Sequence, residues 1–283
     1  METHLFRQTF KASHVRTVFL GSDFHLDAPD TDIALIKTDL ARAQAHHADI
    51  FLNGDIFSLL IPSDRKRYAK STDTMPERDD MINVAVQRAV DLLAPYVNLI
   101  RMIGIGNHEK EILKRHNVDV TAFLIDKLNA LRLPSTPAIR HGGYTGFIRF
   151  LYEHESGGNV RKCDVFYNHG QGGSSEITKG MIDLSRYAGH INADVLWLGH
   201  KHTRGLWMLD PLMGFTPGNK VVCRQRYGVI TGCYSKQLKE YDIVKKGYQI
   251  DYGEEKMRVP VARRGVLMSH TLSAHTLRIE FVL

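Results

Sequence analysis

Side chains that can bind metal ions recur directly after predicted strands in this chain of 283 residues. Apolar and β-branched runs at 15–22, 49–53 and 98–105 predict buried strands, and apolar residues at helical spacing between them predict helices at 32–46 and 81–93. This β-α-β-α-β order indicates a layered α/β fold. Because loops from several strands converge at the carboxyl end of such a sheet, polar residues there can share one site.

A further helix follows the strand at 98–105, and after it the pattern changes to mostly strand-like runs toward the C-terminus. The elements expected in this part are helices at 118–131 and 176–188 and strands at 147–153, 164–168, 194–198, 205–209, 221–234 and 276–282. No repeat, low-complexity tract or Pro/Ser-rich linker divides the chain. One domain over residues 1–283 is therefore expected.

Composition places the chain among ordinary globular proteins, with 43% hydrophobic and 24% charged residues. The N-terminus lacks a signal-peptide pattern, no apolar run approaches the roughly 20 residues of a spanning helix, and the three cysteines form no close pair. A cytoplasmic protein without a membrane partner is expected, and a virus-encoded protein acting in a host cytoplasm would look the same. The net charge of +6 favours polyanionic partners such as nucleic acid, and an ordinary basic surface is an equal alternative.

The first two clusters are weak signals when taken alone. Asp23 and His25 follow the strand at 15–22, and a carboxylate and an imidazole two residues apart can both turn toward one ion. Asp55 follows Gly54 at the end of the strand at 49–53. A loop-capping Asp and a Gly-Asp turn are the common alternatives.

The later clusters are more specific. The string Gly-Asn-His-Glu at 106–109 follows a strand and offers a neutral oxygen ligand in Asn107 and a proton donor in His108. His169 ends the strand at 164–168, and the glycine-rich run after it suits an anion at a helix start.

The last cluster is the pair His200 and His202. Residues at i and i+2 of an extended segment lie on the same side, so both imidazoles can reach one binuclear centre. The pair follows the strand at 194–198 and repeats the placement of the other clusters.

The order Asp-x-His, Gly-Asp, Gly-Asn-His-Glu, His and Gly-His-x-His resembles the calcineurin-like metallophosphoesterase superfamily, over about residues 15–202. The resemblance implies an α/β layered sandwich of two mixed β-sheets flanked by helices, with the metal site at the carboxyl ends of the strands. Residues 203–283 are expected to complete the second sheet, with a cap or dimerisation segment at about 236–273. Ser58 stands where the family often has an acidic residue that supports the site.

The resemblance also implies two divalent ions with one shared carboxylate. The resemblance assigns Asp23, His25 and His202 to the first ion and Asn107, His169 and His200 to the second. Asp55 is assigned to both ions. Oxygen and imidazole ligands without a thiolate suit Mn, the ion expected here, and also Fe, Zn, Ni or Co. A hydroxide held between the ions would attack phosphorus, with His108 at the leaving group as acid or charge stabiliser.

The substrate remains open at this level. Arg65, Lys66 and Arg67 follow Asp55 in a basic loop that could hold a nucleic-acid backbone, and a solvated basic loop is the slightly favoured alternative. The glycine-rich run after His169 is similar to a phage-type branch of the superfamily. A phosphodiesterase, with nucleic acid as one candidate substrate, is expected. A phosphomonoesterase and a non-catalytic scaffold are the alternatives, and a dimer is one candidate oligomeric state.

Overall fold

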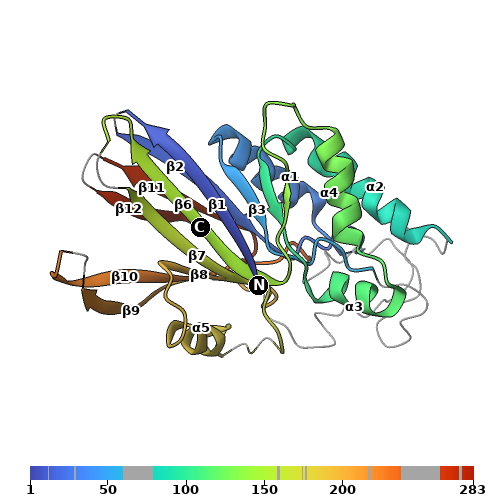
Figure 1. Ribbon diagram of the computed structural model, residues 1–283. Helices are drawn as coiled ribbons and strands as arrows, with labels where there is room; N and C mark the ends of the chain where they lie inside the picture. The colour runs from blue at the N-terminus through green and yellow to red at the C-terminus, as the bar shows by residue number, and fades with distance from the viewer. Residues whose placement is uncertain are drawn as a thin grey trace.

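Two six-stranded mixed sheets pack against each other and carry helices on their outer faces (Figure 1). This computed structural model describes residues 1–11, 13–28, 30–59, 79–157, 160–173, 175, 177–215, 218–236, 262–273 and 276–283. The expected fold class, an α/β sandwich of two mixed sheets flanked by helices, is confirmed.

The first sheet has the order β12-β11-β2-β3-β4-β5, and its neighbours from β2 to β5 run parallel. Its strands are β2 (His14–Gly21), β3 (Asp49–Leu52), β4 (Ile100–Ile103), β5 (Arg140–His141), β11 (Val266–Leu272) and β12 (Leu277–Val282). The helices of this half are α1 (Ile33–Ala45), α2 (Met81–Leu93), the short 3-10 helix η1 (Ala94–Tyr96), α3 (Asn107–His116) and α4 (Val120–Ala130). Buried side chains of α1, α2 and α4 share one apolar core with β2, β3 and β4.

The second sheet has the order β1-β6-β7-β8-β10-β9. Its strands are β1 (Glu2–Phe10), β6 (Thr145–His154), β7 (Arg161–Asn168), β8 (Val195–Leu198), β9 (Gly205–Phe215) and β10 (Val221–Ile230). Helix α5 (Met181–Ala188) packs on its outer face through Leu184. No helix in the described ranges combines the length and apolarity needed to cross a bilayer.

Three differences from the sequence-based prediction have physical causes. The segment Glu2–Phe10 forms a strand although its sequence is largely polar, because only one of its faces is buried while its backbone pairs with β6. The string at 106–109 begins helix α3, in which the Glu109 side chain accepts the backbone N–H of the N-cap residue Gly106. The described residues after 203 contribute to both sheets and not to the second alone, since β9 and β10 extend one and β11 and β12 extend the other. Most of the cap or dimerisation segment expected at about 236–273 lies outside the described residues.

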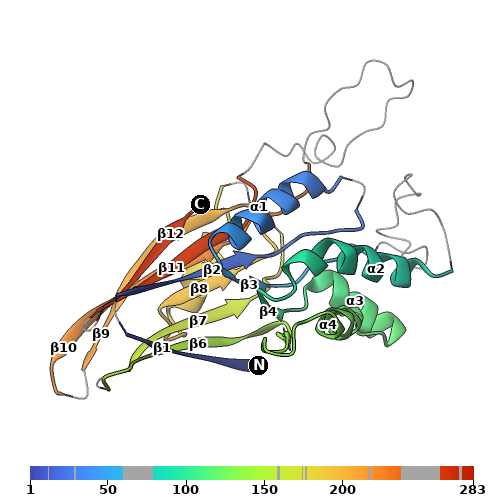
Figure 2. The ribbon, with the colours of Figure 1, turned by 90° about the horizontal axis from the view of Figure 1, so that it is seen from above.

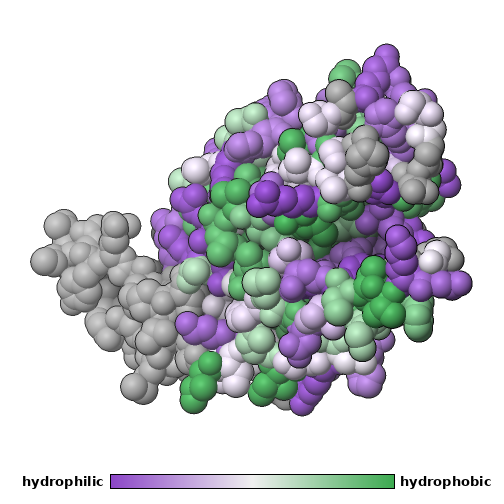
Figure 3. All heavy atoms as spheres, turned by 90° about the vertical axis from the view of Figure 1, so that its left-hand side faces the viewer, coloured by the Kyte–Doolittle hydropathy of each residue, from purple (hydrophilic) through white to green (hydrophobic). Residues whose placement is uncertain are grey.

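The hairpin of β9 and β10 reaches the end of the molecule that lies on the left in Figure 1 and again in Figure 2. After Leu209 its side chains leave the core, and Met213 and Phe215 are 75% and 77% exposed. Hydrophobic surface interrupts the hydrophilic surface in the view onto this end (Figure 3). Strand β9 is also an edge of its sheet, so one side of its backbone has no strand partner in the described chain.

His270 is a buried histidine in the core between the sheets. His270 of β11 is fully buried and contacts the hydroxyl of Tyr152 on β6, with the ring of Phe150 beside it. Burial, assisted by the charge of Arg16, lowers the pKa of His270 from 6.5 to about 3. The imidazole is therefore neutral in the folded protein at physiological pH.

This buried imidazole predicts a loss of stability in mild acid. Between pH 6.5 and pH 3 the unfolded chain binds a proton at His270 that the folded chain does not, so stability falls as the pH falls. From pH 7 to pH 5 this group alone should cost about 2 kcal/mol. Urea unfolding at both pH values should therefore show a smaller loss for His270→Gln than for the wild type. Equal losses would contradict the prediction.

Candidate metal centre

The site lies where the carboxyl ends of strands from both sheets meet. Asp23 and Asp55 follow β2 and β3 of one sheet, and His169 follows β7 of the other. Asn107 and His108 begin α3 after β4, and His200 and His202 follow β8. The seven predicted metal ligands and His108 are linked to one another through one set of contacts. The predicted substrate-binding residues Arg65, Lys66 and Arg67 lie outside the described residues.

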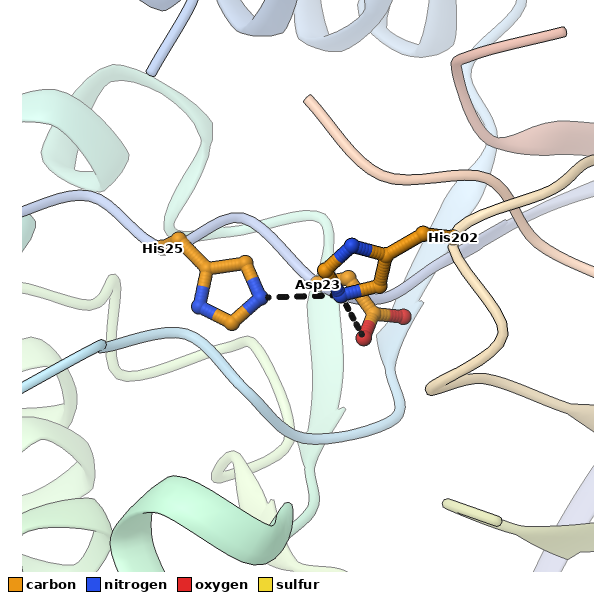
Figure 4. Close-up of side chains that lie close together, drawn as sticks. All are labelled: Asp23, His25 and His202. Carbon is orange, nitrogen blue, oxygen red and sulfur yellow. Dashed lines mark hydrogen bonds and ion pairs between the residues drawn. The ribbon is translucent and has the colours of Figure 1, made fainter. Parts of the chain in front are cut away.

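Asp23, His25 and His202 form the first group (Figure 4). The two Nε2 atoms of His25 and His202 lie 3.3 Å apart, and Nε2 of His202 lies 3.5 Å from Oδ1 of Asp23. On its other side, Nδ1 of His25 lies 3.0 Å from the hydroxyl of Ser58. Ser58 thus contacts the ring nitrogen of His25 that faces away from the group.

Asp55, His169 and His200 form a second group, with Asn107 beside it. Nδ1 of His169 donates to the carbonyl of Asn53 at 2.6 Å, so its Nε2 faces the cluster. That Nε2 lies 3.2 Å from Oδ2 of Asp55 and 3.2 Å from Oδ1 of Asn107. When His169 is neutral, its Nε2, Oδ2 of Asp55 and Oδ1 of Asn107 are three acceptor atoms with no donor between them. A cation stabilises such an arrangement.

The two groups are joined by a third set of possible ligands, His25, Asp55 and His108. Within each of the three groups the ligand atoms lie within 4.8 Å of one another, so Asp55 and His25 each belong to two groups. Carboxylate oxygens and imidazole nitrogens in this number suit borderline divalent ions. The residues present therefore fit adjacent metal positions around Asp55.

His108 lies in the first turn of α3 and is half-buried. Its Nδ1 donates to the carbonyl of Ser58 at 2.7 Å, and its backbone N–H donates to Oδ1 of Asp55 at 3.0 Å. Its ring lies edge-on to that of His25, with centroids 5.0 Å apart. The second ring nitrogen of His108 is thereby left for a group bound in the cluster.

The backbone at the site is held in an uncommon conformation. Asp23, His25, Asp55, His200 and His202 all have positive φ angles, between 48° and 65°. Such angles cost energy in residues other than glycine and persist where the surroundings enforce them, as they do at functional sites. The turns aim these side chains from the strand ends into one cluster.

In the cluster, Asp55 and His169 favour each other's charged forms against the effect of burial. Burial favours the neutral form of Asp55, but His169 and His108 hold the pKa of its carboxyl well below the usual value. Burial acts to lower the pKa of His169, but the Asp55 carboxylate raises it to about 9. Burial lowers the pKa of His25 to about 3. A positive charge is therefore stabilised beside Asp55, where His169 carries a proton when no other cation is bound.

Glu109 was part of a recognised motif, but the sequence did not reveal its task. Its buried carboxylate accepts backbone N–H groups of Asp55 at 3.1 Å, Phe57 at 2.9 Å and Gly106 at 2.8 Å. A side chain at Gly106 would place Cβ 2.0 Å from Oδ1 of Asp55, so only glycine permits this approach. Glu109 therefore fastens the loop of Asp55 to the start of α3.

No protein-family model matches the chain, and no curated protein matches it in sequence. Solved structures show a distant likeness. A conserved protein from Streptococcus pneumoniae, described as a predicted phosphoesterase, has 13% identity and a TM-score of 0.32, and the match covers 95% of this chain and 90% of that one. Vps29 from Entamoeba histolytica complexed with Zn²⁺ has 12% identity and a TM-score of 0.32, with 94% and 98% covered.

A metallophosphoesterase from Sphaerobacter thermophilus has 14% identity and a TM-score of 0.35, and the match covers 94% of this chain and 88% of that one. The descriptions of the first and third of these structures name a phosphoesterase. At these scores the likeness supports no conclusion about function, which rests on the geometry of the metal centre itself.

The hydrogen bonds of Glu109 predict a large effect of its removal. Glu109→Ala leaves three buried N–H groups without their acceptor, and each such loss costs about 1–3 kcal/mol. A loss of about 3 kcal/mol or more in urea unfolding is expected. Glu111→Ala, two residues further along α3, removes an ion pair with the half-exposed Arg115 and should cost less than about 1 kcal/mol. Similar losses in both variants would contradict the role of Glu109.

Proposed function

We propose that this chain is a metal-dependent phosphoesterase of the calcineurin-like type that holds two divalent ions. The observation that carries the proposal is the crowding of acceptor atoms on both sides of Asp55. Proteins bring carboxylates and neutral imidazoles together in this way where a cation is bound. The proposed ligands are Asp23, His25 and His202 for one ion, Asn107, His169 and His200 for the other, and Asp55 for both.

Divalent ions held by these residues would supply Lewis-acid polarisation of a phosphoryl oxygen and would lower the pKa of a water molecule. The side chains of the chain determine where those ions sit. Asn53 and Ser58 each contact a ligand imidazole through the nitrogen that faces away from the cluster, which fixes the orientation of the ring. Mn is the proposed ion, and Fe, Zn, Ni and Co have compatible ligand preferences.

His108 is the proposed acid at the leaving group. Since its Nδ1 donates to the carbonyl of Ser58, the proton to be delivered would be carried on Nε2. A proton transferred from that nitrogen would neutralise the oxygen released from phosphorus. The bond to Ser58 holds the ring in place during the transfer.

A phosphodiester is the proposed substrate class. Lys110, one turn along α3 from Asn107, holds its ammonium 5.4 Å from the ring centroid of Tyr144. The Tyr144 ring in turn lies 5.6 Å from that of His169. A cation and an aromatic ring at the rim of the site suit a nucleic-acid strand, whose backbone carries further phosphates beyond the one that is cleaved. The net charge of +6 favours the same class.

Metal removal and restoration test the proposal. The chelated protein should be inactive, and added Mn should restore hydrolysis of bis-(p-nitrophenyl) phosphate above that of p-nitrophenyl phosphate. Asp55→Asn, measured in parallel, should stay inactive because it loses a charge shared by both ions. A preference for the monoester would contradict the diester as substrate class and indicate a phosphomonoesterase. No turnover of either ester by the metal-loaded protein would contradict a phosphoesterase.

Replacing His108 should separate catalysis from metal binding. His108→Gln should lower kcat for the diester by about 10²–10⁴-fold, the usual contribution of a general acid, while the bound metal remains at the wild-type amount. His116→Gln, at the exposed end of the same helix, should keep wild-type turnover. Loss of metal in His108→Gln, or full activity, would contradict the assigned role.

A further inference from the structure

Lys201 stands between two proposed ligands in the chain, yet its side chain is buried away from them. Its side chain is only 4% exposed, and its ammonium lies 2.7 Å from Oδ2 of Asp183 on α5. The same ammonium donates to the carbonyls of Gln171 at 2.6 Å and Gly173 at 3.3 Å. Among the described residues, three oxygen acceptors thus surround an ammonium that has three N–H donors. Lysine is rarely buried without such partners, so this side chain has a defined position.

The start of α5 is shaped to receive this lysine. Gly180, the N-cap of α5, has a φ of 85°, and a Cβ there would lie 2.5 Å from Cδ1 of Ile230 and 3.2 Å from Cγ of Lys201. The absence of a side chain lets the helix start approach the lysine stem. Asp183, in the first turn, is thereby brought to the ammonium.

The lysine holds the loop that orients a proposed ligand. The carbonyls on either side of Gly172 accept from Lys201, whereas the carbonyl of Gly172 itself accepts from Nε2 of His200 at 2.8 Å. Gly172 has a φ of 77°, which glycine adopts without strain. The same short loop therefore contacts Lys201 on one side and His200 on the other.

The contact with Gly172 determines which nitrogen of His200 is available. A carbonyl accepts only from a protonated nitrogen, so Nε2 carries the hydrogen and Nδ1 has a free lone pair. This Nδ1 is buried and has no hydrogen-bond partner in the part of the chain that the structure describes. His200 belongs to the ligand group of Asp55 and His169. Nδ1 is therefore the atom through which His200 would bind an ion.

We infer that Lys201, held by Asp183, is a positioning residue for the ion at Asp55, His169 and His200, acting through the Gly172 carbonyl; this rests on the proposed two-ion site. Residues that orient a ligand from outside typically change metal affinity by about 10–100-fold. Among the described residues, Gln171, Gly172 and Gly173 make no hydrogen bond to Asp23, His25 or His202, the ligands of the other ion. The loop is linked to Asp23 through His200, whose backbone N–H donates to that carboxylate whatever the orientation of the His200 ring. Loss of Lys201 should therefore weaken one ion and spare the other.

Metal titration tests the inference without an activity assay. Mn binding to the chelated protein is followed by calorimetry, and exchange coupling between two bound Mn ions is followed by electron paramagnetic resonance. The wild type should bind two ions. Lys201→Met, which keeps the stem but removes the donors, should retain one at wild-type affinity and bind the second about 10–100-fold more weakly. Coupling should then appear only at higher Mn concentration.

Matched variants separate positioning from general stability. Lys179→Met, which alters an exposed lysine just before α5, should leave both affinities unchanged. Lys201→Arg, which restores donors to the loop, should recover part of the second affinity. If Lys201→Met does not fold, Asp183→Asn decides the question, since it weakens the anchor and should lower the affinity for the second ion alone.

The outcomes distinguish this inference from the proposed function. Two unchanged affinities in a folded Lys201→Met or Asp183→Asn would overturn the positioning role and leave the proposed function standing. Equal weakening of both ions would also overturn it, because that result shows general loosening of the site. A wild type that binds no metal would instead contradict the proposed function.

Discussion

The contact between the Asp55 carboxylate and His169 is the interaction on which the rest of the site depends. It joins the two sheets, because Asp55 follows β3 and His169 follows β7. Both groups are almost completely buried, and a buried charge is tolerated only when it is paired. The pair therefore requires either a proton or another cation between its acceptor atoms. Every other residue of the site is arranged around this requirement.

The surroundings of that contact are held by the backbone more than by other side chains. Glu109 fixes the loop of Asp55 through N–H groups, and Asn53 fixes the ring of His169 through its carbonyl. Lys201 acts in the same manner on the carbonyls that flank Gly172. Such contacts restrict the ligand atoms by fixing the backbone of the loops that carry or contact them. They also explain how residues with positive φ angles stay in place at the strand ends.

Several elements were predictable because their sequence period matches their burial. Strand β3 and helix α2 match the expected ranges closely. Strand β3 is fully buried, and α2 carries a continuous apolar face, so the apolar pattern of each is clear in the sequence. Strand β1 was not predicted, because its alternation is weak and its stability comes from pairing with β6. Helix α3 was not predicted, and it begins within the motif at 106–109. The helix expected at 176–188 begins at Met181, after a turn that ends at Gly180.

The sequence by itself determined which residues could bind metal and that each follows a strand, because ligand chemistry and strand periodicity are local properties. Only the tertiary structure decided which clusters meet, since strands from two different sheets supply them and sheet order is not encoded in any one segment. The tertiary structure also determined which nitrogen of His169, His200 and His108 faces the site. That choice depends on carbonyls contributed by distant loops, which no local pattern contains.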